Sequence, residues 1–198
     1  MKKTKFQAVI LAGGKGTRLK TISKNIPKPM TQIFGKPLLH HQIEHCAKQG
    51  ITDIHLLVGY NSEAIFNYFS DGSSFGVKIH YHKELKPRGT AGALLDALDS
   101  LNNKFFVIYG DTFLNVDLIS FLSFHNKKNA KITLFLHPNN HPNDSDLIEI
   151  DEQEKIKAIY GYPHPQDKPR RNLVNAGLYI FNKSALSNTK ISKKKSDI

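Results

Sequence analysis

A glycine-rich, basic segment near the start of the chain carries residues that can bind phosphate. Residues 11–19 read Leu-Ala-Gly-Gly-Lys-Gly-Thr-Arg-Leu and follow the apolar run 8–10, which predicts a buried strand entering a tight turn. Glycines have no Cβ, so backbone N–H groups can approach an anion closely, and a concavity of such groups binds phosphate. Lys15 and Arg18 add positive charge, and an arginine can hold two phosphate oxygens at once. The segment predicts a polyphosphate site.

Two better-known phosphate loops do not match this segment. No start within it supplies the P-loop pattern G-x-x-x-x-G-K-[ST]. A dinucleotide fingerprint read from Gly14 gives Gly-Lys-Gly-Thr-Arg-Leu, which lacks the last glycine and argues against a nicotinamide-dependent dehydrogenase. An ordinary tight turn is the plain alternative, but three glycines and two cations directly after a buried strand favour phosphate binding.

Two further charged residues are candidates for the same chemistry. Asp111 follows the apolar run 105–109 and Gly110. A carboxylate at the end of a strand suits Mg²⁺, which takes a few carboxylates together with phosphate oxygens and water. Its alternative role is to cap the helix expected near residue 116. Lys28 lies between two prolines that restrict the backbone, and its alternative is an exposed loop lysine.

Strand and helix patterns alternate over the first 136 residues. We expect strands at 6–12, 54–58, 77–82, 105–109 and 132–136, and helices at 37–50, 61–69, 90–101 and 116–125. This order predicts an α/β fold with an open, mostly parallel sheet flanked by helices, with ligands bound beyond the carboxyl ends of the strands. A loop at 137–146 and strands at 147–150, 156–160 and 174–181 predict a small mixed β subregion near the C-terminus.

Composition limits the class of protein. The 198 residues suit one domain, and no apolar stretch is long enough to cross a membrane. Cys46 is the only cysteine, so no intramolecular disulfide forms, which fits a cytoplasmic location. The net charge of +11 is scattered, so we expect anionic small substrates rather than nucleic acid or a membrane surface. The dense basic cluster at 190–195 is expected to be a solvated tail.

Five further short motifs occur in the order typical of one enzyme family. They are Pro-Lys-Pro-Met at 27–30, Gly-Lys-Pro-Leu-Leu at 35–39, Gly-Thr-Ala-Gly-Ala-Leu at 89–94, Gly-Asp at 110–111 and Asn-Ala-Gly-Leu-Tyr at 175–179. Together with the glycine-rich segment they resemble the sugar-phosphate nucleotidyltransferases, over residues 6 to about 181. The resemblance implies a Rossmann-like, GT-A-like nucleotidyltransferase fold.

The resemblance also implies a reaction: a sugar 1-phosphate attacks the α-phosphate of a nucleoside triphosphate, with Mg²⁺ as cofactor, and pyrophosphate leaves. Catalytic roles are implied for Arg18, Lys28 and Asp111, the last of these also as the metal ligand. The implied nucleotide contacts are Leu11, Ala12, Gly13, Gly14, Lys15, Gly16, Thr17, Glu84, Arg88, Gly89 and Thr90. The implied sugar-phosphate contacts are Gly110, Lys168, Asn175 and Gly177.

Residues 143–149 most resemble the heptose 1-phosphate and mannose 1-phosphate guanylyltransferases, which favours GTP and a role in making cell-surface polysaccharide such as lipopolysaccharide or capsule. A uridylyl-, cytidylyl- or thymidylyltransferase of the same family remains an alternative. So does a non-catalytic nucleotide-sugar-binding regulatory protein. A homo-oligomer is also possible.

The C-terminal part departs from the family pattern. We expect a nucleotide-binding core at 1–136, a sugar-phosphate-binding part at 137–185 and a basic tail at 186–198. Family members carry an acidic-Lys-Pro element before the Asn-Ala-Gly strand, a role that Asp167-Lys168-Pro169, Arg170 or His164 could fill. Members also run further and supply a second metal-binding aspartate there, so the pattern predicts either a truncated chain or metal binding by Asp111 alone.

One short zinc pattern is interpreted as structural. His41, Glu44 and His45 match H-x-x-E-H as text. The apolar residues Ile43 and Cys46 predict that this helix packs on the core, and no downstream acidic ligand follows. We therefore expect a surface helix with two histidines rather than a zinc site.

Overall fold

The computed structural model describes residues 6–14, 26–59, 61–84, 88–140, 142, 145–164, 170–187 and 198. Several predicted functional positions lie outside these ranges: Lys15, Gly16, Thr17, Arg18, Lys168, residues 143–144 and most of the basic tail. The chain forms two compact units, Met1–Thr133 with Tyr179–Ile198, and Leu134–Leu178. Each unit is described by itself.

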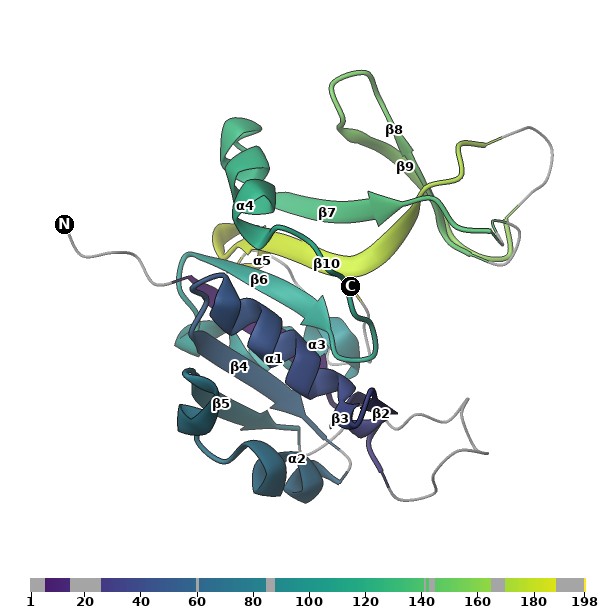
Figure 1. Ribbon diagram of the computed structural model, residues 1–198. Helices are drawn as coiled ribbons and strands as arrows, with labels where there is room; N and C mark the ends of the chain where they lie inside the picture. Colours follow the sequence, from purple (N-terminus) through teal and green to yellow (C-terminus); the bar gives the residue numbers. More distant parts are fainter. Residues whose placement is uncertain are drawn as a thin grey trace. The chain divides into compact units, whose positions relative to one another are not determined.

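A parallel sheet organises the first unit (Figure 1). β1 (Gln7–Ala12) pairs in parallel with β4 (Asp53–Val58) on one side and with β6 (Lys104–Tyr109) on the other, and β4 pairs in parallel with β5 (Lys78–Lys83). The full order is β5-β4-β1-β6-β10-β7, in which β7 (Ile132–His137) and β10 (Val174–Asn182) run from one unit into the other. The expected mostly parallel sheet is confirmed.

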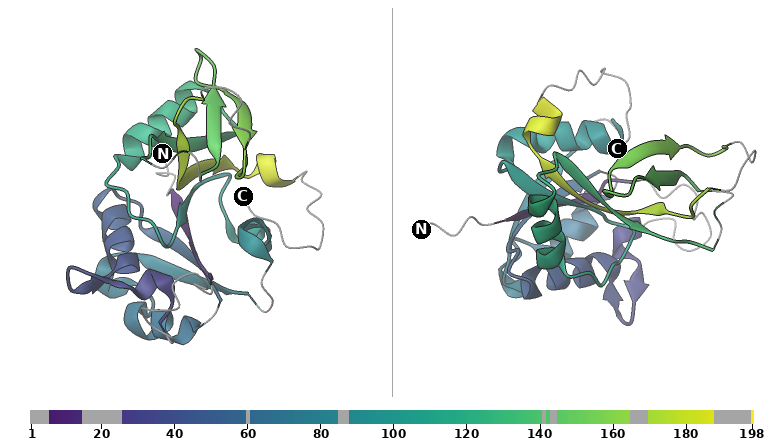
Figure 2. Two further views of the ribbon diagram at one scale, coloured as in Figure 1. Left: turned by 90° about the vertical axis from the view of Figure 1, so that its right-hand side faces the viewer. Right: turned by 90° about the horizontal axis from the view of Figure 1, so that it is seen from above.

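Helices cover this sheet. They are α1 (Leu38–Lys48), α2 (Ser62–Phe69), α3 (Gly89–Ala97), α4 (Leu118–Lys127) and the short α5 (Ser184–Ser187). Figure 2 shows α1 and α3 on opposite faces of the sheet. The apolar stripe of α1 is buried completely at Leu39, Ile43 and Cys46, so the helical period in the sequence did mark the face that packs on the strands.

Short elements refine the expected boundaries. The helix expected at 90–101 is α3 followed by a 3₁₀ turn, η3 (Leu98–Ser100). Another 3₁₀ turn, η2 (Ser73–Phe75), precedes β5. A third 3₁₀ turn, η1 (Lys28–Met30), leads into a hairpin of β2 (Gln32–Ile33) and β3 (Lys36–Pro37).

The helix expected from residue 116 begins at Leu118. Asp117 caps it, because its Oδ1 accepts from the N–H groups of Ile119 and Ser120 at 3.0 and 2.8 Å. Asp117 therefore has the capping role that was the alternative for Asp111, and that alternative is wrong.

The second unit contains an antiparallel pair, β8 (Leu147–Ile150) and β9 (Ile156–Tyr160), in the register Leu147↔Tyr160. The Tyr160 hydroxyl donates to Glu149 Oε2 at 2.7 Å, and the guanidinium of Arg170 lies 4.6 Å from the centre of the Tyr160 ring. The strands expected at 147–150 and 156–160 are confirmed.

None of the helices within the described ranges combines the length and the apolar character needed to cross a bilayer.

The free energy of unfolding should decrease at acid pH because of a buried histidine in the first unit. His125 on α4 is 1% exposed, with its ring nitrogens 2.7 Å from Thr133 Oγ1 and 3.3 Å from Asn182 Oδ1. Burial lowers its pKa, the hydrogen bond with Asn182 raises it in part, and the charge of Lys104 lowers it further. Below about pH 6.5 this histidine binds a proton in the unfolded chain but not in the folded protein. The free energy of unfolding should therefore decrease as the pH is lowered through that range.

Urea unfolding at about pH 7.5 and about pH 5.5 measures this dependence. The variant His125→Gln should lose less stability between the two values than the wild type does. Burial also lowers the pKa of His40, His55 and His82, so the comparison between the two proteins isolates His125. The control His137→Gln, at an exposed position, should lose as much as the wild type. Equal losses in the wild type and His125→Gln would contradict the prediction.

Candidate active site

The carboxyl ends of four parallel strands form one rim of the sheet (Figure 1). Gly13 follows β1, Gly59 follows β4, Glu84 follows β5, and Gly110 with Asp111 follows β6. The chain places β4 and β5 on one side of β1 and then β6 on the other, so the strand order reverses between β1 and β6. Open α/β sheets bind ligands at such a reversal. The structure thus brings the two strongest sequence motifs to one rim.

Glycines let the segments of this rim approach one another closely. A Cβ added at Gly13 would lie 2.9 Å from Glu84 Oε2, and one added at Gly59 would lie 2.8 Å from the carbonyl oxygen of Gly13. By contrast, a Cβ added at Gly14 would meet no described atom within 4 Å. The end of the flexible Glu84 side chain could move aside, whereas backbone could not, so packing requires Gly59 more strictly than Gly13, and Gly14 has no described atom in front of it. Gly59 was missed in the sequence because it stands alone rather than in a recognisable motif.

A pocket of about 510 Å³ opens between the end of β4, the end of β5 and α3. Its lining residues are Leu57, His82, Lys83, Glu84, Arg88, Ala93 and Asp96. Glu84 Oε1 accepts from the backbone N–H of Arg88 at 3.3 Å, and the Arg88 guanidinium pairs with Asp96. The structure brings Glu84 and Arg88 to one pocket, and Asp96 is an addition that the sequence did not suggest.

The remaining residues expected on this side lie at the start of α3. Gly89 adopts a positive φ of 79°, which a residue with a side chain rarely does. The Thr90 hydroxyl oxygen accepts from the backbone N–H of Ile198 at 2.9 Å. Leu11 and Ala12 are the last two residues of β1; Leu11 is half-buried and Ala12 is buried.

A lysine and an aspartate face each other at the end of β6. Lys28 Nζ lies 3.4 Å from Asp111 Oδ2, and the two side chains are 27% and 46% exposed. Pro29 and Met30, the residues after Lys28, are buried and anchor η1. Lys28 is thus held beside the rim, which argues against its interpretation as a free loop lysine. Screening by solvent makes such a half-exposed pair worth little to stability, so both groups remain available to a ligand.

The segment that carries Asp111 is held by two side chains of α1, Gln42 and His45, and by Gln49, which follows the helix. Gln42 Nε2 donates to the carbonyl oxygens of Tyr109, at 2.8 Å, and Thr112. His45 Nε2 lies 2.8 Å from the carbonyl oxygen of Val116. Gln49 donates to that same oxygen at 3.0 Å and accepts from the N–H of Leu118 at 2.7 Å. The sequence signal for this role is a glutamine within the apolar stripe of a helix.

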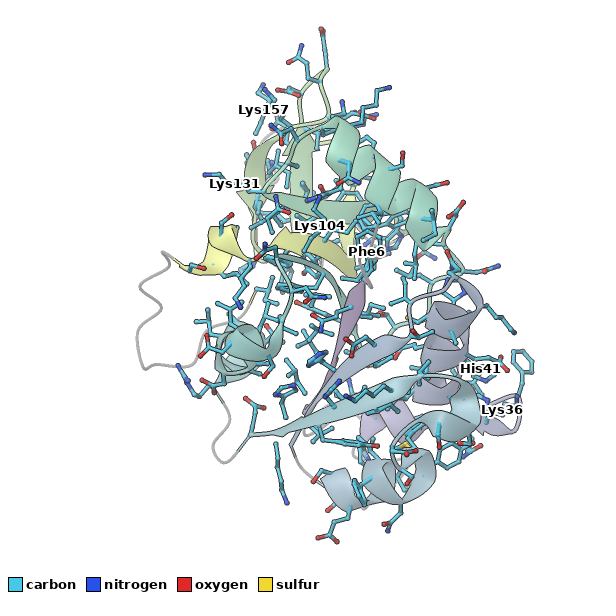
Figure 3. The ribbon with its side chains drawn as sticks, turned by 90° about the vertical axis from the view of Figure 1, so that its left-hand side faces the viewer. Phe6, Lys36, His41, Lys104, Lys131 and Lys157 are labelled. Carbon is cyan, nitrogen blue, oxygen red and sulfur yellow. The ribbon has the colours of Figure 1, made fainter. Side chains whose placement is uncertain are left out.

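The H-x-x-E-H pattern does not form a cluster. His41 Nε2 lies 2.8 Å from the carbonyl oxygen of Ile33, near Lys36 of the hairpin (Figure 3), whereas His45 faces Val116. Glu44 pairs instead with Lys48 at 3.2 Å and Lys36 at 3.8 Å. The structural interpretation of this pattern holds.

Asp111 suits the metal that such a site would need. Its carboxylate is half-exposed at the rim and shares that position with one cation, Lys28. Mg²⁺ is commonly held by one or two carboxylates and completed by substrate phosphates and water, so this donor set fits it.

Of the residues expected on the sugar side, Asn175 and Gly177 belong to the second unit and Gly110 belongs to the first. Asn175 Oδ1 accepts from the N–H of Gly177 at 3.0 Å, and Gly177 has a φ of 75°, so the two shape a local turn within β10. Of the residues suggested for the phosphate, Arg170 stacks on Tyr160 and His164 Nε2 lies 3.2 Å from the carbonyl oxygen of Pro142. Lys168 lies outside the described residues.

An open parallel sheet, a glycine-lined rim, a pocket at the ends of β4 and β5 and a Lys–Asp pair at the end of β6 are typical of an α/β protein that binds a phosphorylated nucleotide. The family described as nucleotidyl transferase matches residues 7–197, and the chain belongs to this family. Its relatives in this family are sugar-1-phosphate nucleotidyltransferases.

Relatives of assigned activity support this assignment. The D-glycero-alpha-D-manno-heptose 1-phosphate guanylyltransferase of Campylobacter jejuni is 36% identical over 191 residues, which cover 96% of this chain and 81% of the relative. The mannose-1-phosphate guanylyltransferase of Mycobacterium tuberculosis is 32% identical over 180 residues, or 90% of this chain and 49% of the relative. The chain spans about half the length of that enzyme.

Solved structures show the same fold. HddC from Yersinia pseudotuberculosis complexed with GMP-PN matches with a TM-score of 0.78 and 28% identity, over 97% of this chain and 82% of HddC. A putative glucose-1-phosphate thymidylyltransferase from Bacillus anthracis matches with a TM-score of 0.84 at 24% identity, which bears on the fold alone.

Proposed function

We propose that this protein transfers a guanylyl group from GTP to a heptose-type or mannose-type sugar 1-phosphate. A phosphate oxygen of the sugar attacks the α-phosphorus, the bond from that phosphorus to the bridging oxygen breaks, and pyrophosphate leaves with a nucleoside-diphosphate sugar as the product. The observation that carries the proposal is the Lys28–Asp111 pair at the glycine-lined rim, in a chain related to guanylyltransferases.

Positioning and charge neutralisation are the main demands of this reaction. Lys28 is proposed to move its ammonium group from Asp111 to a phosphate oxygen, since the existing pair is weak. Open space at Gly14 leaves room for the triphosphate against the backbone. Arg18, outside the described residues, is proposed to hold the departing pyrophosphate. Asp111 would hold Mg²⁺, which supplies neutralisation of the negative charge that develops on the phosphates.

The pocket beside the rim is proposed to receive the base. Guanine presents two adjacent donors, N1–H and the 2-amino group, and a carboxylate can accept from both. Glu84 offers such a carboxylate in the pocket, with Oε2 close to Gly13. The similar HddC structure contains GMP-PN, a guanine nucleotide analogue, which supports the same base here.

The sugar 1-phosphate is proposed to be bound by residues of the second unit. Asn175 and Gly177 form a turn whose amide can donate to and accept from sugar hydroxyls. Lys168 is proposed to contact the sugar phosphate. A cytoplasmic location, where both substrates are made, and activity without nucleic acid are part of this proposal.

Pyrophosphate release in the presence of Mg²⁺ tests the proposal. Each of GTP, UTP, CTP, ATP and dTTP is offered with a heptose 1-phosphate and with mannose 1-phosphate. Release with GTP and one of these sugars would support the proposed substrates. Release with a different nucleoside triphosphate would show that GTP is not the substrate, but it would still support a nucleotidyltransferase reaction. Binding of a triphosphate without release from any pair would favour the non-catalytic alternative.

Recognition of guanine can be tested by a single variant. The wild type should use GTP at least about tenfold better than ITP, which lacks the 2-amino group, because a bidentate base contact contributes about 1–3 kcal/mol. Glu84→Gln replaces one acceptor by a donor and should remove most of this preference. The ratio of kcat/KM for the two nucleotides is the measurement. Glu63→Gln, exposed on α2, is the matched control and should keep the wild-type ratio. An unchanged ratio in Glu84→Gln would contradict base recognition by this carboxylate.

A further inference from the structure

A second group of metal-binding side chains lies away from the rim, near the amino ends of β4 and β5. Asp53 is the first residue of β4, and the parallel register pairs His55 of β4 with His80 of β5. Ligand atoms of these three residues all lie within 4.8 Å of one another. The carboxylate Oδ1 of Asp53 is 3.0 Å from His80 Nε2 and 3.8 Å from His55 Nε2. We refer to these three residues as the Asp53 cluster.

Hydrogen bonds determine which nitrogen of the His55 ring carries the proton. The backbone N–H of Asn102 donates to Gln7 Oε1 at 2.6 Å, so the other end of this amide must be its NH₂ group. That NH₂ group lies 3.0 Å from Asp53 Oδ2 and 3.1 Å from His55 Nε2. An amide nitrogen only donates, so His55 Nε2 must accept and carries a lone pair.

The opposite nitrogen of the ring completes the assignment. His55 Nδ1 lies 2.8 Å from His82 Nε2, and with Nε2 unprotonated it is Nδ1 that holds the hydrogen and donates. An imidazole that donates from Nδ1 keeps a lone pair on Nε2; here that lone pair accepts from Gln7, and a metal ion at this position would take the place of that hydrogen bond. The buried His55, 2% exposed, is thus prepared as a ligand by residues from β1, β5 and the segment before β6.

The hydrogen-bonding capacity of the Asp53 carboxylate is also not fully used. Among the described residues Asp53 Oδ1 has no hydrogen-bond partner, although it is shielded from water and His80 Nε2 is only 3.0 Å away. The N–H of His80 is therefore not directed at this oxygen. A buried carboxylate oxygen without a partner is costly, and a cation beside it would remove that cost.

We propose that the Asp53 cluster binds one Zn²⁺ ion through Asp53 Oδ1, His55 Nε2 and His80 Nε2, with water at a fourth position. Two imidazoles and a carboxylate are a zinc ligand set, and ligands at about 2.0–2.2 Å from a tetrahedral ion lie about 3.4 Å from one another. The observed separations of 3.0 and 3.8 Å bracket that value. His80 is 34% exposed, so it can adjust its ring and it opens the site to solvent.

This site is separate from the proposed catalytic metal. Asp111 follows the carboxyl end of β6, whereas Asp53 begins β4, so the two carboxylates stand at opposite ends of their parallel strands. Oxygen ligands suit Mg²⁺ at Asp111, and nitrogen ligands suit Zn²⁺ at the Asp53 cluster. Zinc binding can be measured without nucleotide, so its outcome does not depend on the proposed transferase activity.

Isothermal titration of the metal-free full chain with Zn²⁺ at about pH 7.5 tests the proposal. The wild type should bind one equivalent tightly. His80→Ala removes a ligand at a half-exposed position and should weaken this binding at least about 100-fold, the upper end of what loss of a supporting residue costs. Asp53→Asn, nearly identical in shape, should also weaken it and serves if His80→Ala folds poorly. His55 is left unchanged because it is buried between strands.

His41→Ala is the matched control, because it removes a histidine of the H-x-x-E-H pattern and should leave the stoichiometry and affinity unchanged. Histidine nitrogen chemical shifts give a second readout: Zn²⁺ should move the Nε2 signals of His55 and His80. Zinc should raise the Tm of the wild type but not that of His80→Ala. Equal zinc binding by the wild type, His80→Ala and Asp53→Asn, loss of binding only in His41→Ala, or no binding by the wild type would each overturn the proposal.

Discussion

Replacing Asp111 by asparagine should lower the rate of pyrophosphate release at least about 1,000-fold, because neutralisation of phosphate charge by a metal contributes several kcal/mol and each 1.4 kcal/mol is about tenfold in rate. The substitution keeps the shape of the side chain and removes its charge. The free energy of unfolding should change by less than about 1 kcal/mol, since the ion pair lost among the described residues is the half-exposed contact with Lys28.

The measurement is kcat with saturating substrates, together with urea unfolding of the same preparations. Asp99→Asn is the matched control: Asp99 is an exposed aspartate in η3, and its variant should keep wild-type activity and stability. If Asp111→Asn retained activity within about tenfold of the wild type, the role of Asp111 in holding the metal would be refuted.

Replacing Gly110 by alanine should damage both the fold and the reaction. The added Cβ would lie 2.7 Å from the carbonyl oxygen of Leu11 and 3.1 Å from Pro29 Cγ. Backbone cannot move aside as a flexible side chain can, and the hydrogen bond from Gly110 N–H to Leu11, now 3.0 Å, would lengthen. We expect a loss of about 2 kcal/mol in the free energy of unfolding. Asp111 would shift with its neighbour, and a displacement of about 1 Å costs about 100-fold in rate.

Gly14→Ala separates a steric cause from the general effect of adding a methyl group near the rim. Its Cβ would meet no described atom within 4 Å, so its free energy of unfolding should stay within about 0.5 kcal/mol of the wild type. Urea unfolding of the two variants gives the comparison. Equal stability of Gly110→Ala and the wild type would show that the close approach of β1 and β6 at Gly110 is not required.

Much of the fold could be predicted because its signals are local. Buried parallel strands have nearly continuous apolar runs, as in Ala8, Val9 and Ile10, and helices repeat apolar residues every three to four positions, as in α1. The motif after β1 and the Gly-Asp pair after β6 could be assigned to one rim because parallel strands end on the same side. The roles of Arg18 and Lys168 stay predictions, since both lie outside the described residues.

Other parts of the site could not be predicted because they depend on contacts between distant residues. Gln42 supports the segment after β6 from a helix 67 residues earlier in the chain, and nothing near Gln42 in sequence indicates that partner. Gly59 matters only because the end of β4 meets the carbonyl of Gly13. The spacing of residues along the sequence does not indicate which distant segments come close to one another.

From its sequence alone, this protein is an open α/β nucleotidyltransferase with a phosphate-binding turn and a carboxylate at the end of a strand, since periodicity and short motifs are properties of neighbouring residues. The tertiary structure alone decided that Lys28 faces Asp111, that Glu84 packs on Gly13, and that Asp53, His55 and His80 share one place. The physical reason is strand register: one step of slippage between β4 and β5 would turn His55 and His80 to opposite faces of the sheet.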